Sequence, residues 1–115
     1  MNGEWLPREA EVLVAEPTVR TRRFKYTLVV LLRGEVDESG TDDLRRVLVD
    51  AIVRQRPRRV VVDLAMVTAL DPMAVGALMA AHDTAPQMRV RLALRRPNDG
   101  VAVQLSTAGL THLID

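Results

Sequence analysis

Apolar residues along the chain change between the spacing of strands and the spacing of helices. Two short apolar runs, at residues 26–33 and 60–64, each predict a buried strand. The first run ends at Gly34, and its continuous apolarity predicts a central strand that is covered on both faces. Alternation with arginine predicts another strand at residues 90–94, and a single apolar side predicts an early strand at residues 18–23.

Between these strands the apolar spacing becomes helical. Residues 42–54 follow the i, i+3, i+4, i+7, i+8 pattern of an amphipathic helix, with Thr41 as its predicted N-cap. Residues 35–43 are expected to form an acidic connector before it. A second helix is predicted to begin with Asp71 as N-cap and Pro72 as first residue, and to end near residue 84.

Asn98 predicts the N-cap of a third helix at residues 99–107, and Gly109 is a natural left-handed stop for it. Residues 65–70 are expected to form a connector, and residues 111–114 to begin one more strand. The order is therefore strand, strand, helix, strand, helix, strand, helix. This order predicts an α/β fold with a mixed sheet of four or five strands covered by helices, whose first two strands are antiparallel neighbours.

The chain length of 115 residues fits one domain. Residues 1–11 are mixed and polar, and Pro7 breaks any period, so we expect them to be loosely ordered. The folded domain is expected to span residues 12–115. Residues 12–15 offer an additional strand that Pro17 separates from the one at residues 18–23.

The helix that begins at Asp71 is apolar nearly all round, since residues 73–81 contain no charged side chain. Helical spacing assigns one stripe to the core: Val75, Leu78, Met79 and His82. Other sides of the helix then carry Met73, Gly76 and Ala80. These residues either lie under neighbouring helices or form a contact surface, and we favour the contact surface because one small sheet offers little cover.

Composition and charge exclude several function classes. The net charge is +1 and aromatic residues make up 3%, so neither a basic field nor stacking platforms favour nucleic acid or an anionic membrane. No cysteine is present, which excludes disulfides and thiolate metal sites. His82 and His112 have no metal-ligand neighbours at helical spacing, and no glycine-rich phosphate loop occurs. We expect a soluble intracellular protein without metal or cofactor.

Three segments resemble the STAS domain (sulfate transporter and anti-sigma factor antagonist), and specifically the small bacterial anti-sigma factor antagonists. They are LVVLLRGEVD at residues 28–37, VVVDLAMVTALDPMAVGAL at residues 60–78 and VAVQLSTAGLTHL at residues 101–113. The resemblance implies the STAS fold and a non-enzymatic role in which the protein binds an anti-sigma factor, a kinase-like regulator, and so frees a sigma factor. It implies these partner-binding residues: Asp37, Thr68, Asp71, Pro72, Met73, Gly76 and Ala80.

Where phosphorylatable members of that family carry the serine that the kinase modifies, this chain has Pro72. Met73 and Ala74 likewise replace the Ser or Thr and the Gly that usually follow. Proline has no hydroxyl group, so we predict that no phosphorylation switch operates at this position.

Two other roles stay open from the sequence. In the first, the apolar helix packs against a second copy of the chain or within a larger regulatory assembly, with no sigma factor involved. In the second, the chain is a small enzyme or nucleotide-binding module, which has the least support. A run of arginines at residues 54, 56, 58 and 59 is expected to be solvated, with pairing to an acidic partner as the alternative.

Overall fold

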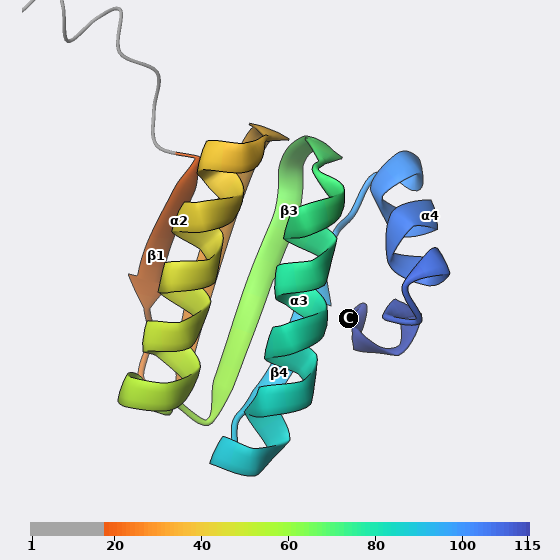
Figure 1. The fold of residues 1–115 in the computed structure, drawn as a ribbon. Coiled ribbons are helices and arrows are strands. Elements are labelled where there is room, and N and C mark those ends of the chain that lie inside the picture. The colour runs from red at the N-terminus through yellow and green to blue at the C-terminus, as the bar shows by residue number, and fades with distance from the viewer. Residues whose placement is uncertain (1–17) are drawn as a thin grey trace, which may run out of the picture.

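The computed structural model describes residues 18–115, and the expectations for residues 1–11 and for a strand at residues 12–15 lie outside them. One four-stranded sheet has the order β1–β2–β3–β4 (Figure 1). Its strands are β1 (Val19–Arg23), β2 (Thr27–Val36), β3 (Arg59–Leu70) and β4 (Arg91–Arg95). β1 pairs with β2 in antiparallel orientation, and β2, β3 and β4 run parallel. The predicted mixed sheet and its antiparallel first pair are confirmed.

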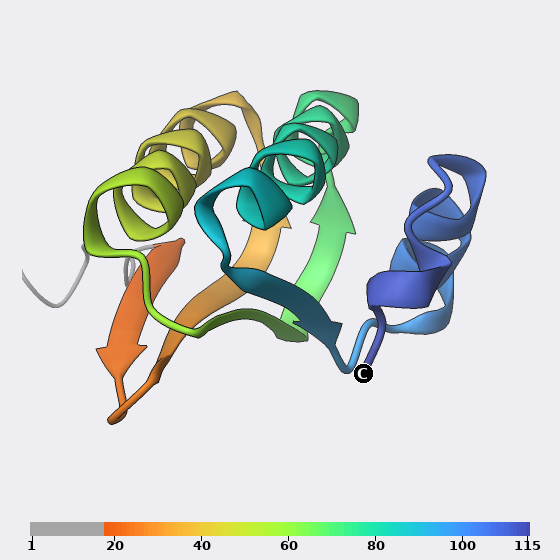
Figure 2. The same ribbon diagram turned by 90° about the horizontal axis from the view of Figure 1, so that it is seen from below.

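Three main helices complete the fold, and all lie where the order of elements predicts them. They are α2 (Glu38–Val49), which continues into a π-helical turn (Asp50–Gln55), α3 (Pro72–Thr84) and α4 (Asp99–Thr107). α2 and α3 lie side by side across one face of the sheet, and α4 stands beside the β4 edge (Figure 2). Two short 3-10 helices, η2 (Ala85–Met88) and η3 (Thr111–Leu113), follow α3 and α4.

The main core is aliphatic and fills the space between the sheet and its two covering helices. Successive inward-facing residues of β3 are fully buried: Val60, Val62 and Leu64. They meet Leu44 and Ile52 from the α2 side, and Leu78 from α3 belongs to the same cluster. Burial of each such side chain stabilises the fold by about 1.5–3 kcal/mol, so this layer fixes where both helices lie.

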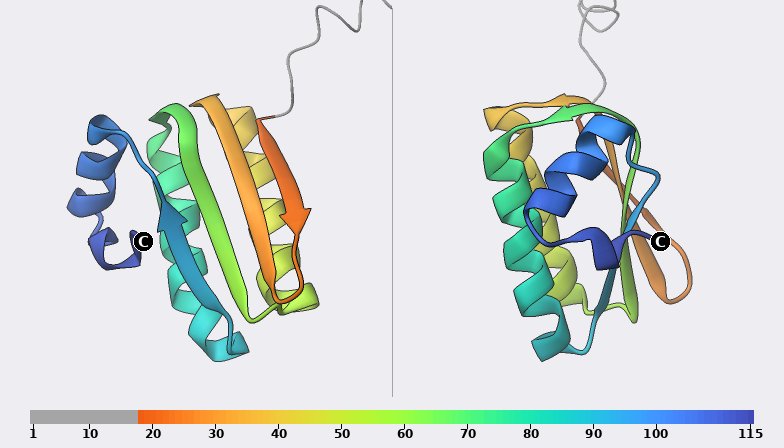
Figure 3. Two further views of the ribbon diagram at one scale, coloured as in Figure 1. Left: turned by 180° about the vertical axis from the view of Figure 1, so that it is seen from behind. Right: turned by 90° about the vertical axis from the view of Figure 1, so that its right-hand side faces the viewer.

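The central position predicted for β2 is confirmed, because side chains of both its faces are buried. Val30, toward the helices, is 0% exposed, and Val29, on the opposite face, is 7% exposed. Val29 belongs to a second, small cluster with Val61, Ala93 and Leu31. No helix of residues 18–115 covers that opposite face (Figure 3). The two faces therefore differ in what covers them.

α2 begins four residues earlier than the sequence predicts. Its N-cap is Asp37, whose carboxylate accepts a hydrogen bond from the N–H of Gly40 at 2.9 Å. Thr41, the predicted cap, is 2% exposed within the helix. The expected acidic connector is wrong because Asp37 caps the helix itself, so that Ser39 and Gly40 enter its first turn despite their preference for loops.

β3 continues through residues 65–70, so the connector expected there is also wrong. These residues pair with the second half of β2, which itself runs past Gly34 to Val36. Irregular register between residues 31 and 35 accommodates the extra length, and Gly34 has a φ of +73°. At the other end, residues 111–113 form η3 instead of the start of the expected strand, and Ile114 makes an isolated bridge with Leu94.

Candidate functional site

Two helix N-caps lie side by side at the carboxyl edge of the parallel strands. β2 and β3 end at the paired residues Val36 and Leu70, so Asp37 and Asp71 come next on neighbouring strands. The N–H of Asp71 donates to the carbonyl of Val36 at 2.8 Å. Its carboxylate accepts from the N–H of Met73 at 2.7 Å, and Pro72, at the first position of α3, has no N–H to satisfy. The predicted start of α3 is confirmed.

α3 presents one continuous exposed face. We call the α3 stripe the exposed residues Pro72, Met73, Gly76, Met79 and Ala80. The side chains of Met73 and Met79 are 63% and 42% exposed, and none of the five residues is charged. The opposite side of the helix is buried, mainly through small residues: Ala74, Val75, Ala77, Leu78 and Ala81.

Met79 was expected in the core, and that prediction is wrong. α3 packs against both the sheet and α2, so its buried side is wider than a single stripe. Alanines at positions 74, 77 and 81 fill this side and permit close approach of the backbone. The larger Met79 is therefore left outside. Met73, Gly76 and Ala80 lie exposed, on the sides of the helix where the spacing places them.

Gly76 has no structural requirement within the described part of the chain. A Cβ atom built at this position would meet nothing within 4 Å. Gly76 also lies inside a regular helix, where glycine costs about 0.5–1 kcal/mol relative to alanine. A glycine that the fold does not need, on an uncharged exposed face, leaves room for the close approach of another molecule.

Exposed apolar residues of the neighbouring helices widen this surface. On one side, Val49 and Val53 of the α2 region are 51% and 37% exposed and share a cavity of about 70 Å³ with Ala80. On the other side, α4 contributes Val103, 64% exposed, to a hollow of about 310 Å³ beside Pro72. The sequence analysis did not single out Val103. Helical spacing could have identified this residue. Val101 and Leu105 lie on the buried side of α4, and Val103, midway between them, therefore lies on the outer side.

α4 is attached to the end of β3 by side-chain amides. Gln104 Nε2 donates to the carbonyl of Leu70 at 2.8 Å, and Asn98 Nδ2 donates to the carbonyl of Val67 at 3.1 Å. Asn98 also caps α4 by accepting from the N–H of Val101, as predicted. The strand end, the start of α3 and the exposed side of α4 are thus held in one arrangement, with Thr68 exposed beside them.

The structure thus brings part of the predicted site together. Asp37, Asp71, Pro72 and Met73 meet at the strand ends, whereas Gly76 and Ala80 extend the surface along α3. Among residues 18–115, no cluster of three histidine or acidic side chains is placed to hold a metal ion. No helix in this part of the chain is long and apolar enough to cross a membrane.

A sequence profile described as Mlab, STAS domain matches residues 19–115. No curated protein sequence was matched. Among solved structures, unphosphorylated SpoIIAA, an anti-sigma factor antagonist, is 18% identical, with a TM-score of 0.77 over 84% of this chain and 85% of that one.

Two further structures are similar. An anti-sigma factor antagonist from Mycobacterium paratuberculosis is 18% identical, with a TM-score of 0.73 over 84% of this chain and 81% of that one. A variant of RsbS from Moorella thermoacetica is 20% identical, with a TM-score of 0.68 over 80% and 78%. At these identities the likeness shows a common fold.

Proposed function

This chain belongs to the STAS domain family, and on that premise we propose that it binds an anti-sigma factor or a related kinase-like regulator and thereby frees a sigma factor. The structural likeness to anti-sigma factor antagonists supports this class of partner. In this proposal the protein is bacterial, acts in the cytoplasm and catalyses no reaction. One observation carries the proposal: the exposed, uncharged α3 stripe beside two satisfied helix caps.

The partner docks on the α3 stripe and on the strand ends beside it. A specific interface buries about 800 Å² on each partner, more than one helix face supplies. The contact therefore includes Asp37, Thr68 and the exposed Val103 of α4. Met73 and Met79 are flexible and apolar, which suits adaptable contacts, and the missing side chain at Gly76 lets the partner approach the helix backbone.

Substitution at Met73 tests the docking surface. Met73→Glu places a charge at the centre of the proposed contact and is expected to weaken partner binding by at least about thirtyfold, the effect of losing a binding hot spot. Met66→Glu is the matched control, since Met66 is 65% exposed and stands on β3 instead of α3. Affinity capture from the native host, followed by titration of the captured partner, measures both. Equal affinity of the two variants would contradict this docking surface.

Regulation at position 72 follows from its chemistry. Pro72 is exposed at the start of α3 and offers no hydroxyl group, so the complex is controlled by abundance or by the partner. Incubation with the cognate kinase and ATP is expected to leave the intact mass unchanged, whereas Pro72→Ser supplies an acceptor. Stoichiometric phosphate mapped to residues 65–80 of the unsubstituted protein would contradict the proposal, with Thr68 as the only hydroxyl there.

A second candidate function is a self-associating or scaffold subunit of a larger regulatory assembly. The observation in its favour is the breadth of exposed apolar surface, which extends from α3 to Val49 on one side and Val103 on the other. Size-exclusion chromatography with light scattering separates the two functions. A stable dimer that Met73→Glu dissociates would support the scaffold, and a monomer would favour the transient regulatory complex.

A further inference from the structure

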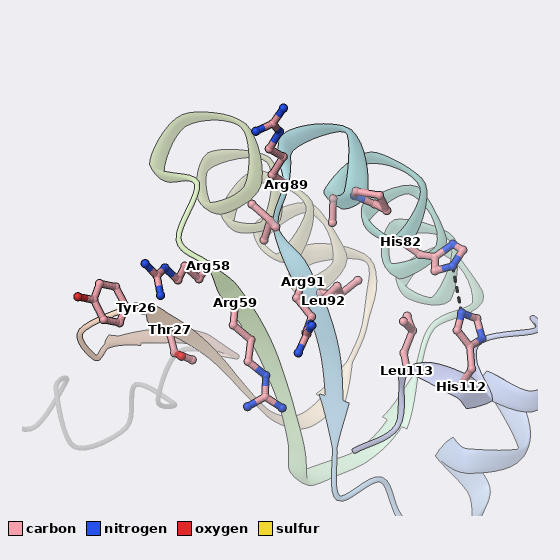
Figure 4. Close-up of a pocket in the computed structure, with 13 residues that line it drawn as sticks. Tyr26, Thr27, Arg58, Arg59, His82, Arg89, Arg91, Leu92, His112 and Leu113 are labelled. Carbon is pink, nitrogen blue, oxygen red and sulfur yellow. Dashed lines mark hydrogen bonds between the residues drawn. The ribbon is translucent and has the colours of Figure 1, made fainter.

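An arginine-lined groove lies at the edge of the sheet opposite to the proposed docking surface. It has a volume of about 770 Å³ and is lined by the beginnings of β2, β3 and β4 and by the end of α3 (Figure 4). Because these strands are parallel, their beginnings share one edge and their ends the other. Arg59 in the groove and Leu70 at the strand ends are the first and last residues of β3. We call this groove the arginine groove.

The groove concentrates positive charge in a chain that is almost neutral overall. Its lining includes four guanidinium groups and no carboxylate: Arg58, Arg59, Arg89 and Arg91. Asp115 is not a lining residue but accepts from Arg59 Nη2 at 2.6 Å, so a bound anion would share Arg59 with this carboxylate. The formal net charge of the whole chain is +1, so this excess is local.

Arg59 and Arg91 are placed as a pair. They occupy partner positions on the parallel strands β3 and β4, and the N–H of Arg91 donates to the carbonyl of Arg58 at 2.9 Å. Both side chains extend to the same side of the strands in Figure 4. Like charges opposite one another weaken a sheet, so this pairing gains from a shared counter-charge.

Arg59 has an unused donor. Its Nε atom is buried and has no hydrogen-bond partner among the described residues, although Nη2 of the same side chain is paired. A buried donor without an acceptor destabilises a fold. An oxygen atom of a bound anion would satisfy it.

Aromatic and imidazole side chains form two ends of the groove. The guanidinium of Arg58 lies over the ring of Tyr26, with Cζ 4.4 Å from the centroid, which orders this arginine without neutralising it. At the far end, His82 of α3 and His112 of η3 are joined Nε2 to Nε2 at 3.1 Å. Leu113 adds apolar surface to the groove, whereas Ala85 and Leu92 are almost completely buried beneath it.

We propose that the arginine groove binds a phosphate-bearing ligand, whose phosphate oxygens are held by Arg59 and Arg91. Guanidinium groups match phosphate oxygens in geometry and charge, and several of them together favour a group with more than one negative charge. The groove volume falls within the range of small-molecule sites. This site is separate from the docking surface on α3, and either can fail without the other.

Inorganic pyrophosphate is the soluble probe, titrated at low salt and followed by calorimetry and by backbone NMR shifts. Vesicles of phosphatidylcholine, with and without phosphatidic acid, test the same chemistry on a lipid headgroup. We expect saturable binding of pyrophosphate or of the phosphatidic acid vesicles, with shifts centred on residues 58, 59 and 91. Whichever probe binds identifies the source of the phosphate, and failure of both overturns the proposal.

The double variant Arg59→Gln with Arg91→Gln is expected to lose at least about tenfold in affinity. Arg45→Gln with Arg46→Gln on α2 changes the net charge equally outside the groove and is expected to bind like the unsubstituted protein. Equal affinity of the two double variants would mean general charge attraction and would overturn the site. If the first double variant does not fold, the exposed Arg89→Gln serves instead and is expected to weaken binding with the thermal transition unchanged.

Discussion

The two edges of the parallel sheet differ in almost every chemical respect. At the carboxyl edge, the acids Asp37 and Asp71 are engaged by backbone N–H groups, and the adjoining helix face carries no charge. At the amino edge, four arginines line a groove without a carboxylate of its own. The first edge suits contact with an apolar protein surface, and the second suits a small anion. The two proposed kinds of recognition therefore use opposite edges of one sheet.

The largest expected effect is a loss of stability that disturbs the docking surface and the arginine groove together, because α3 contributes residues to both. Leu78 is fully buried beneath this helix. Leu78→Ala is expected to lower the free energy of unfolding by about 2–5 kcal/mol through lost burial and a cavity. Urea denaturation measures it, with Met73→Ala, on the exposed side of the same helix, as the control. A loss below that of the control would mean that α3 is not fixed by the core.

A smaller loss of stability is expected from a change at the carboxyl edge alone. Asp71→Ala removes the cap of α3 and is expected to cost about 1 kcal/mol of stability, while phosphate binding at the arginine groove stays unchanged. Asp42→Ala removes an exposed partner of Arg45 and is the control, worth less than about 0.5 kcal/mol. Thermal unfolding and pyrophosphate titration of each variant test the separation. Weaker pyrophosphate binding in Asp71→Ala would show that the two edges are coupled.

The smallest expected effect is a gain in stability instead of a loss. Gly76→Ala is expected to stabilise α3 by about 0.5–1 kcal/mol, because a Cβ atom there meets only open space. The same methyl group is expected to weaken partner binding if the partner approaches the backbone. Denaturation and partner titration on one sample give both values. A stabilised variant with undiminished binding would remove Gly76 from the interface.

Local capping chemistry was predictable from the sequence. Asp71 with Pro72, Asn98, and Gly109 with its φ of +76° each do what their residue types favour, because a cap needs only groups a few residues away. The same reasoning chose Thr41 over Asp37, since both are good caps and only the packed helix decides between them. Pairing across the sheet was not predictable in the same way, and residues 65–70 became strand because the extended β2 pairs with them.

The candidate surface was predictable in part for the same reason. Helical spacing placed Met73, Gly76 and Ala80 away from the core, but the orientation of Met79 depended on α2 lying alongside. The arginine groove could not be predicted from the sequence. Arg58 and Arg59 were visible as a basic turn, whereas Arg89 and Arg91 join them only through the parallel pairing of β3 with β4.

The hydrogen bond from the Asp71 N–H to the Val36 carbonyl makes the start of α3 the outermost rung of the sheet. Asp71, which caps this helix, therefore cannot leave the sheet unless that hydrogen bond opens. The rate at which the Asp71 amide hydrogen exchanges with solvent consequently measures how often this hydrogen bond opens, without any added label. Because Pro72 has no amide hydrogen, the next residue contributes no competing signal. A partner that binds firmly at this end of the molecule is therefore expected to slow the exchange of the Asp71 amide hydrogen.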